Sequence, residues 1–376
     1  MRSSARIDLD AIAANVRVLD GLAGAAQVMA VVKADGYGHG LLPSARAALA
    51  GGAAWLGVAF LEEALALRAA GLHAPVLAWL TTPGEDLTPA VAADVDLGVY
   101  DEPALARAAA AGRQAGRPAR VQLKVDTGLS RGGTRPELWP ALCEAAAKAE
   151  ADGAVRVTGV WSHFANADGG ADHPVTRRQA EVFDRALDVV DQAGLRPDVR
   201  HLANSAATLT APGTHYDLVR PGLAVYGLSP VPQLGRPADF GLRPAMSLRS
   251  HVALVKRVPA GAGVSYGHRY TTATQTTLAL VPLGYADGVP RSGTNALEVL
   301  LGARRRRFAG TVCMDQFVLD VGDDDIAEGA EVLLFGPGDD GEPTAQDWAD
   351  VLGTIDYEIV TRIGPRVPRV YVGGGT

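Results

Sequence analysis

The sequence predicts a TIM (β/α)8 barrel followed by a mostly β C-terminal domain. In the first 240 residues, eight short apolar runs alternate with alanine-rich stretches of helical periodicity. Most of these runs are near-continuous in Val, Leu and Ile, as parallel strands buried on both faces should be. Beyond about Phe240 the helical stretches nearly vanish, and short strand-like runs are separated by Gly, Pro and Asp clusters. Eight strand–helix units favour a barrel. A doubly wound open sheet remains the alternative, because periodicity cannot show closure.

The barrel strands and several helices can be placed along the chain. We expect the strands at Val28–Lys33, Ala54–Ala59, Pro75–Leu80, Val95–Tyr100, Arg120–Val125, Arg156–His163, Val199–Leu202 and Tyr216–Arg220. One helix begins at Asp101-Glu102-Pro103, with Asp as N-cap and Pro in the first turn, and ends at Gly112 or Gly116. Two more are expected at Leu61–Ala70 and Asp172–Ala193, closed by Gly71 and Gly194.

The second part of the chain is expected to be rich in strands. These are predicted within Met246–Leu254 and at Leu278–Leu283, Phe308–Cys313, Gln316–Val321 and Val332–Phe335. The Pro- and Gly-rich stretch Pro230–Pro237 is interpreted as the linker. We therefore expect a barrel over residues 12–236 and a β domain over residues 237–376, with residues 1–11 pairing onto the β domain.

The composition of the chain argues against several classes of function. The net charge of −7 argues against a nucleic-acid surface, and the run Arg304–Arg307 is interpreted as a solvated face rather than a basic patch. The two cysteines, Cys143 and Cys313, offer neither a disulfide framework nor zinc spacing, so no metal is expected. Residues 1–10 lack an apolar signal core, and no run reaches the ~18 apolar residues of a membrane span. We expect a reduced, cytoplasmic protein with no membrane or nucleic-acid partner.

Polar groups gather where the predicted strands end. Five of the eight strands end in or lead to a polar or ionisable group. These groups are Lys33, Lys124, His163, Asn204-Ser205 and Arg220. In a TIM barrel the C-terminal ends of the strands form one rim and carry the active site. A structural protein would have little reason for this pattern.

Two features of that rim indicate pyridoxal phosphate (PLP). Lys33 ends a long apolar run, and burial would lower its pKa and free the amine for a Schiff base. The backbone N–H groups of Gly222 and Leu223, helped by Ser205, could bind a phosphate after the last strands. Taken separately, each feature also has an ordinary interpretation, as a lysine snorkelling at a strand end or as a turn glycine and helix cap.

Several segments resemble the alanine racemase family. The VKADGYGHG segment at Val32–Gly40 is similar to its PLP-attachment signature. Further matching segments are Leu123–Gly132, Ser162–Ala165, Asn204-Ser205, Val219–Gly227, Gly263–Gly267, Gly284–Gly288, Cys313–Gln316 and Asp356–Glu358. The resemblance extends over nearly the whole chain, and it departs at Pro221, which removes one N–H, and at Thr361, where cysteine is common.

The resemblance implies a two-base racemisation of alanine with PLP. Lys33 would hold PLP and move a proton on one face of the α-carbon, and Tyr266 of the partner subunit would do so on the other. A tyrosine with a pKa of ~10 needs neighbours that lower it, and His163 and Arg220 are candidates. The partner's contribution implies a homodimer with composite active sites, supplying D-alanine for peptidoglycan.

The resemblance also implies binding roles. Tyr37, Ser205, Gly222, Leu223 and Tyr357 would hold the phosphate, with Asn204 and His163 in the same cofactor site and Arg220 facing the pyridine nitrogen. Arg131 would bind the substrate carboxylate near Lys124, which is often carbamylated in the family. From the partner, Met314 would add a backbone N–H near that carboxylate, and Tyr285 and Asp315 would line the entrance.

Three alternatives stay open at this point. An amino-acid decarboxylase of the same fold would lack the Val32–Gly40 segment and would put a carboxylate, not Arg220, at the pyridine nitrogen. A non-catalytic PLP-binding barrel would lack the second domain and hence Tyr266. A broad racemase acting on serine or basic amino acids would tend to be exported, and no signal for export is visible.

Overall fold

The structure is a computed structural model in which residues 2–374 are described. The chain divides into two compact units. One contains residues 12–36 and 41–242, and the other contains the described residues of the ranges 1–11, 37–40 and 243–376. The chain therefore crosses between the units three times near its start, after residue 11 and at either end of residues 37–40.

The first unit is a parallel β-barrel. Its eight-stranded sheet has the order β8-β7-β6-β5-β4-β3-β2-β9 within the described residues. The strands are β2 (Gln27–Val31), β3 (Trp55–Val58), β4 (Val76–Ala78), β5 (Val95–Val99), β6 (Ala119–Lys124), β7 (Val155–Trp161), β8 (Val199–His201) and β9 (Leu218–Val219). Each of the eight predicted runs overlaps one of them, with bounds that differ by up to a few residues.

Closure distinguishes this barrel from a doubly wound open sheet. The first barrel strand, β2, pairs in parallel with β3 on one side and with the last strand, β9, on the other. The remaining gap between β8 and β9 is spanned by a parallel bridge between Asn204 and Arg220 and by the Asp217 N–H, which donates to the Arg200 carbonyl at 3.0 Å. The predicted fold class is therefore confirmed and its alternative is wrong.

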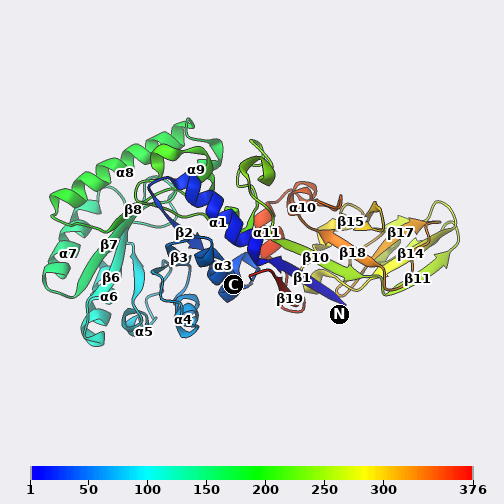
Figure 1. The fold of residues 1–376 in the computed structure, drawn as a ribbon, viewed down its shortest axis with the longest axis horizontal. Helices are drawn as coiled ribbons and strands as arrows, with labels where there is room; N and C mark the ends of the chain where they lie inside the picture. Colours follow the sequence, from blue (N-terminus) through cyan, green and yellow to red (C-terminus); the bar gives the residue numbers. More distant parts are fainter. Residues whose placement is uncertain (1, 375–376) are drawn as a thin grey trace. The chain divides into compact units, whose positions relative to one another are not determined.

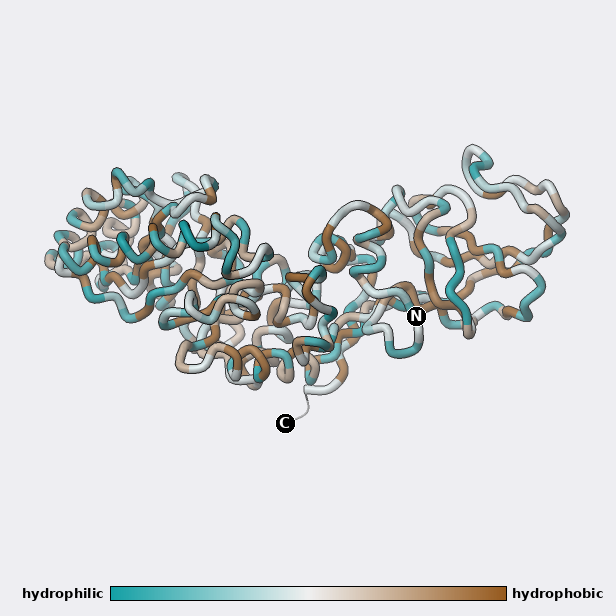
Figure 2. Tube along the Cα trace, turned by 90° about the horizontal axis from the view of Figure 1, so that it is seen from above, coloured by the Kyte–Doolittle hydropathy of each residue, from teal (hydrophilic) through white to brown (hydrophobic). Residues whose placement is uncertain are grey.

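Helices surround the barrel strands (Figure 1). The α-helices of this unit, with α1 and α2 crossing its boundaries, are α1 (Leu9–Ala23), α2 (Lys33–Tyr37), α3 (Leu41–Ala50), α4 (Leu61–Ala69), α5 (Thr88–Ala92), α6 (Glu102–Ala115), α7 (Trp139–Ala151), α8 (Pro174–Gln192) and α9 (Ser205–Thr210). Asp101 caps α6 by accepting from the Ala104 N–H at 2.7 Å, and left-handed Gly116, rather than Gly112, ends it. Hydrophilic and hydrophobic residues alternate along the outer helices, as amphipathic helices require (Figure 2).

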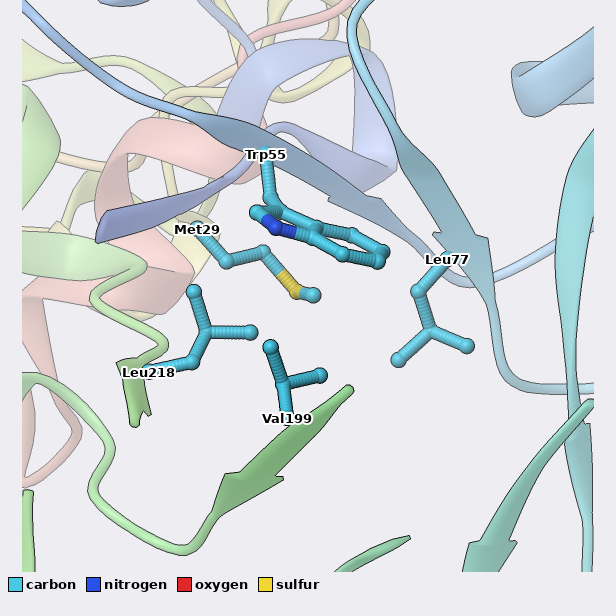
Figure 3. Close-up of a cluster of buried hydrophobic side chains, with 5 residues drawn as sticks. All are labelled: Met29, Trp55, Leu77, Val199 and Leu218. Carbon is cyan, nitrogen blue, oxygen red and sulfur yellow. The ribbon is translucent and has the colours of Figure 1, made fainter. Parts of the chain in front are cut away.

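Apolar side chains fill one part of the barrel interior. Met29, Trp55, Leu77, Val199 and Leu218 come from five different strands and converge on one buried cluster (Figure 3). This interdigitation of side chains from different strands is how a TIM barrel excludes a central channel. The functional groups are therefore carried where the strands end.

The second unit is built on three sheets. Their orders are β16-β15-β18-β10-β1-β19, β11-β14-β17 and β12-β13. The strands are β1 (Ser3–Asp8), β10 (Met246–His251), β11 (Leu254–Val258), β12 (Gly263–Val264), β13 (Tyr270–Thr271), β14 (Thr276–Val281), β15 (Glu298–Leu301), β16 (Arg304–Arg307), β17 (Phe317–Gly322), β18 (Glu331–Phe335) and β19 (Arg369–Val372). Strand β1 lies between β10 and β19, so the two chain ends share one sheet (Figure 1).

The predictions for this unit need one correction and one addition. Phe308–Cys313 is not a strand: Phe308 makes an isolated bridge to Leu319, and the residues that follow form a loop held by side-chain hydrogen bonds. Two short α-helices that the sequence analysis did not place, α10 (Ala345–Leu352) and α11 (Asp356–Thr361), follow the sheet strands, with Thr344 capping α10.

Short 3-10 helices occupy many of the connections. They are η1 (Ala167–Gly169), η2 (Pro212–Thr214), η3 (Leu223–Tyr226), η4 (Pro237–Phe240), η5 (Tyr266–His268), η6 (Tyr285–Asp287) and η7 (Arg291–Gly293). The arginine run forms β16, and each of its four guanidinium groups is paired with a carboxylate of Asp324, Asp347 or Glu298. Among residues 2–374, no helix is both long enough and apolar enough to cross a bilayer.

Candidate active site

Lys33 begins a turn with an unusual backbone. Ala34, Asp35, Gly36 and Tyr37 all have positive φ, between 52° and 60°. For residues other than glycine, this left-handed region costs roughly 1–2 kcal/mol each. Such strain persists only where surrounding contacts enforce it, and it is concentrated at functional sites. The turn is therefore the first structural indication that Lys33 has a function.

Glu63 is one of the contacts that hold this turn. Its Oε1 accepts from the Ala34 N–H at 2.7 Å, and its Oε2 accepts from the N–H groups of Ala59 and Phe60. One carboxylate therefore ties the residue after Lys33 to the first turn of α4. Gly36 packs closely as well, since a Cβ there would lie 2.7 Å from Ser44 Oγ.

The Lys33 amine lies in surroundings that favour its neutral form. Burial lowers its pKa, Arg131 lowers it further, and Glu63 opposes the shift. The Nζ atom lies 5.9 Å from the centroid of the Trp79 ring. A lysine with a lowered pKa is a better nucleophile and proton acceptor at neutral pH than an ordinary surface lysine.

Four cations share the barrel rim. Burial, followed by repulsion from Arg220 and Arg131, lowers the pKa of Lys124 to about 8. The pKa of His163 falls well below its usual value, first because of burial and then because of Arg220, Arg131, Lys124 and Lys33. The ring of His163 is therefore neutral within a positive field, which suits an anionic ligand.

Arg220 is fully buried and held by several acceptors. It donates to the carbonyl oxygens of Ser162 and Leu202 at 2.7 and 3.2 Å and to Nδ1 of His163 at 3.3 Å. Its Cζ lies 5.1 Å from the centroid of the Trp161 ring. Burial lowers the pKa of this guanidinium to about 9. Arg220 is thus a fixed cation at the end of β9.

The loops after β8 and β9 present polar groups side by side. Asn204 caps α9 by accepting from the Ala207 N–H at 3.1 Å. Ser205 Oγ accepts from the N–H groups of Gly222 and Ala224 at 2.8 and 3.3 Å. Leu223, next to Gly222, begins η3. A hydroxyl and backbone donors in this position match the usual phosphate site of the fold. The Pro221 carbonyl oxygen accepts a hydrogen bond from the Val31 N–H, so a proline is accommodated at this position.

In the second unit, the predicted phosphate residues Tyr37 and Tyr357 are neighbours. Their ring centroids are 6.2 Å apart, and burial raises the pKa of Tyr37. The glycines beside Tyr37 allow close approach: a Cβ on Gly38 would lie 2.6 Å from the Val360 carbonyl oxygen, and one on Gly40 would lie 2.1 Å from the Tyr371 hydroxyl. Residues 37–40 thus pass against α11 and β19 of this unit.

The remaining predicted residues of the second unit surround one loop. Tyr266, Tyr285 and Met314 are 75%, 44% and 53% exposed. The backbone joins them: Thr311 Oγ1 donates to the Tyr266 carbonyl, and the N–H that follows Tyr285 donates to the Met314 carbonyl. Asp315 lies on the same loop and pairs with Arg366 at 2.7 Å. Large apolar side chains gathered on a surface are typical of an interface.

The donor set fits PLP. An anionic phosphate suits the hydroxyl and N–H groups after β8 and β9, and the positive rim suits both that phosphate and an amino-acid carboxylate. The half-buried amine of Lys33, with its lowered pKa, suits an aldehyde. We therefore regard the residues present as compatible with this cofactor.

Several residues of the site were not found by sequence reasoning. Trp161 contacts the rim cations, with Lys124 Nζ 4.4 Å from its ring centroid. His201 accepts a hydrogen bond from Arg220, and Glu63 anchors the Lys33 turn. His201 could have been found from the sequence, because it is a polar residue inside a predicted apolar run. Glu63 could not have been found in this way, because its only sequence feature is its place in the first turn of a helix.

Comparison with known proteins agrees with this geometry. The chain matches the family models for the N-terminal domain of alanine racemase over residues 7–230 and for its C-terminal domain over residues 245–371. The alanine racemase of Frankia casuarinae is 66% identical, over 99% of this chain and 97% of the relative, and that of Thermobifida fusca is 62% identical, over 99% and 98%. The crystal structure of alanine racemase from D-cycloserine-producing Streptomyces lavendulae superposes with a TM-score of 0.97 at 56% identity, covering 100% of this chain and 98% of that one.

Proposed function

Since the chain belongs to the alanine racemase family and is therefore a racemase, we propose that it interconverts L- and D-alanine with PLP by a two-base mechanism. The observation that carries this function is the half-buried Lys33 amine with a lowered pKa, held on a strained turn at a cationic rim. When bound, PLP supplies an electron-withdrawing ring that acidifies the α-hydrogen of the amino acid.

Lys33 is one of the two proton carriers. Its Nζ would hold the cofactor and would take or return a proton at the α-carbon of the amino acid. Burial and Arg131 support this role, because both keep the amine from being permanently protonated. Glu63 supports it by fixing the backbone that follows Lys33.

Tyr266 of the partner subunit carries the proton on the opposite face. Racemisation needs a second group there, because the proton must leave from one side and return on the other. The 75% exposure of Tyr266, beside the exposed Tyr285 and Met314, fits a surface that a second copy of the chain covers. We therefore propose a homodimer with two composite active sites.

The other residues bind and orient. Tyr37, Tyr357, Asn204, Ser205, Gly222 and Leu223 hold the cofactor phosphate and the turns around it. Arg131 orients the substrate carboxylate beside Lys124, Met314 of the partner adds a backbone N–H, and the partner's Tyr285 and Asp315 line the entrance. His163 and Arg220 would hold the ring of the cofactor, and Arg220, which has no acceptor, would leave the ring nitrogen unprotonated. That choice favours reversible proton exchange over deeper electron withdrawal.

The two domains have different roles, and each role belongs to one part of the chain. Residues 12–236 form the PLP-binding barrel domain. Residues 237–376, with residues 1–11 pairing onto them, form the β domain that supplies Tyr266 to the partner. We place the enzyme in the cytoplasm, supplying D-alanine for peptidoglycan, with alanine and a second copy of the chain as its partners.

Isotope incorporation tests the reaction. The purified protein, loaded with PLP, is incubated with L-alanine, L-serine, L-lysine or L-arginine in deuterated water, and the enantiomers are followed by chiral mass spectrometry. We expect fast appearance of α-deuterated D-alanine and slow reaction of the others. Comparable rates on serine or the basic amino acids would indicate a broad racemase. Absence of exchange with PLP bound would refute the proposal.

Mixing two inactive variants tests the composite site. Lys33→Ala and Tyr266→Phe should each abolish racemisation. In their heterodimer, one site collects both substitutions and the other is intact, so random exchange of subunits should restore about a quarter of the wild-type sites. Sites built from one chain would give no recovery. Each variant mixed with itself is the control.

A further inference from the structure

A line of hydrogen bonds leads from Arg220 into the barrel interior. Arg220 Nη1 lies 3.0 Å from Nδ1 of His201 on β8. His201 Nε2 lies 2.7 Å from Oε1 of Gln122 on β6, and Gln122 Nε2 lies 2.8 Å from Oδ2 of Asp96 on β5. All four side chains are buried, Arg220 being 5% exposed and the other three 0%. The line thus joins a rim cation to a carboxylate near the start of β5.

The two ends of this line fix every proton within it. A guanidinium can only donate, so His201 Nδ1 accepts and its proton sits on Nε2. Gln122 Oε1 then accepts from His201, which turns the amide nitrogen of Gln122 toward Asp96. The carboxylate can only accept. Burial and the charge of Arg220 keep the pKa of His201 well below its usual value, so the ring stays neutral with this one tautomer.

The carboxylate is itself fixed from other directions. Arg120 Nε donates to Asp96 Oδ1 at 2.6 Å, and Thr158 Oγ1 donates to Asp96 Oδ2 at 2.5 Å. The Arg120 side chain is 25% exposed, so the charge of Asp96 is balanced near the barrel edge. Charge-assisted hydrogen bonds of this kind are stronger than neutral ones. Asp96 is therefore a rigid end point.

A glycine in the barrel wall leaves room for this line of hydrogen bonds. Gly159 lies on β7, between β6 and β8, and a Cβ there would lie 2.8 Å from Gln122 Oε1. Only the lack of a side chain at Gly159 lets the Gln122 amide reach over β7 to His201. Trp161 stacks on the His201 ring with centroids 5.8 Å apart and planes 3° apart. The imidazole is thereby held in its plane.

A purely structural barrel core has no need of these groups. The neighbouring interior is filled by apolar side chains such as Leu77, which pairs in register with Asp96. Burying a polar line is costly unless every member is satisfied, and a satisfied line specifies one rigid arrangement. What this line specifies is the position of Arg220, since Arg220 is its one member at the rim.

We propose that Asp96 and Gln122 are positioning residues of the active site, which act through His201 to hold the Arg220 guanidinium in its catalytic orientation. The effect on catalysis rests on the proposed role of Arg220 at the cofactor. The orientation of the line itself does not rest on that role.

Two variants interrupt the line, and a third serves as a matched control. Gln122→Met keeps the length of the side chain but removes both hydrogen bonds, and Asp96→Asn removes the terminal charge with little change in shape. Thr158→Val is the control: it deletes a different hydrogen bond to the same carboxylate and leaves the line intact. Each full-length protein is labelled with 15N-histidine, loaded with PLP and studied by NMR. The His201 signal is assigned by its loss in His201→Asn. Kinetics with L-alanine and thermal unfolding are measured in parallel.

In the wild type, the NMR spectrum should show His201 protonated on Nε2. Gln122→Met and Asp96→Asn should shift the His201 signal and lower kcat about tenfold with KM changed less than twofold. Thr158→Val should lower the melting temperature, yet leave His201 and kcat as in the wild type.

A proton on Nδ1 of wild-type His201 would overturn the proposal, even if a variant failed to fold. Equal kinetic effects in Thr158→Val and the two line variants would also overturn it, because they would indicate loss of stability alone. If the line behaves as expected but the wild-type protein racemises no alanine, the proposed function fails while the positioning of Arg220 stands.

Discussion

Asp356 should make the stability of this protein depend on pH in a direction unusual for a carboxylate. Asp356 opens α11, is 3% exposed, and lies next to Tyr357. Burial raises its pKa to about 7, against the lowering effect of hydrogen bonds from the N–H groups of Tyr357 and of Asp356 itself. The folded protein therefore keeps this carboxyl protonated at pH values where the unfolded chain has lost the proton.

The sign and size follow from linkage. Because the folded pKa lies above the unfolded value of 3.8, the protonated carboxyl favours folding below pH 3.8. This contribution to the free energy of unfolding is lost as the pH rises towards 7. Above pH 7 it does not change further. At about 1.4 kcal/mol per pKa unit, the whole loss is about 4 kcal/mol, of which about 2 kcal/mol falls between pH 5 and pH 7.

Asp356→Asn tests this reasoning, because asparagine resembles the protonated carboxyl at every pH. Urea unfolding of both proteins at pH 5, 6, 7 and 8, at one protein concentration, gives the difference in free energy of unfolding. The difference should move in favour of the variant by about 2 kcal/mol between pH 5 and pH 7 and then level off. Asp350→Asn removes an exposed carboxylate on α10 whose charge also raises the pKa of Asp356, so the pH trend should be smaller in that background than in the wild type. Parallel pH curves for wild type and Asp356→Asn would refute the assigned pKa and its cause.

Three further predictions concern the rim. Glu63→Ala leaves the Ala34 N–H and two others without their acceptor, so it should lower the free energy of unfolding by about 2 kcal/mol in urea titrations, whereas Glu63→Gln should lose less. Gly36→Ala puts a Cβ at positive φ and 2.7 Å from Ser44 Oγ, so differential scanning calorimetry should show a loss of about 2 kcal/mol; an unchanged melting temperature would contradict the strained turn. Lys124→Met removes a buried amine whose pKa is lowered from 10.5 to about 8, so it should stabilise the protein by about 3 kcal/mol at pH 7, with the gain falling above pH 8 and vanishing only above pH 10.5, where the wild-type amine is neutral in both states. Destabilisation at pH 7 would instead indicate that Lys124 carries a carbamate.

Local patterns in the sequence were enough for the barrel elements. The strand at Val95–Val99 and the helix after Asp101 were predictable, because hydrophobic periodicity and helix caps depend on neighbours within a few residues. The same reasoning failed at Phe308–Cys313, where an apolar run forms a loop. There the backbone bonds to side chains such as Asn295, which is distant in sequence, and no local pattern reports such a partner.

The candidate site was likewise predictable from the sequence only in part. The sequence singled out Lys33, Lys124, His163 and Arg220 from their places at strand ends, and the structure shows that their charges influence one another. It gave no sign of the left-handed turn after Lys33, apart from its glycines.

By itself, then, the sequence determined the eight strand–helix units, the mostly β domain after them and the residues at the strand ends, because the carboxyl ends of parallel strands lie on one edge. Only the tertiary structure decided that the sheet closes, through β2 pairing with β9, and that Arg220 is tied to Asp96 through His201 and Gln122. Closure and buried hydrogen bonds join residues far apart in the chain. Their geometry is set by the packing of the whole barrel, which no segment of sequence contains.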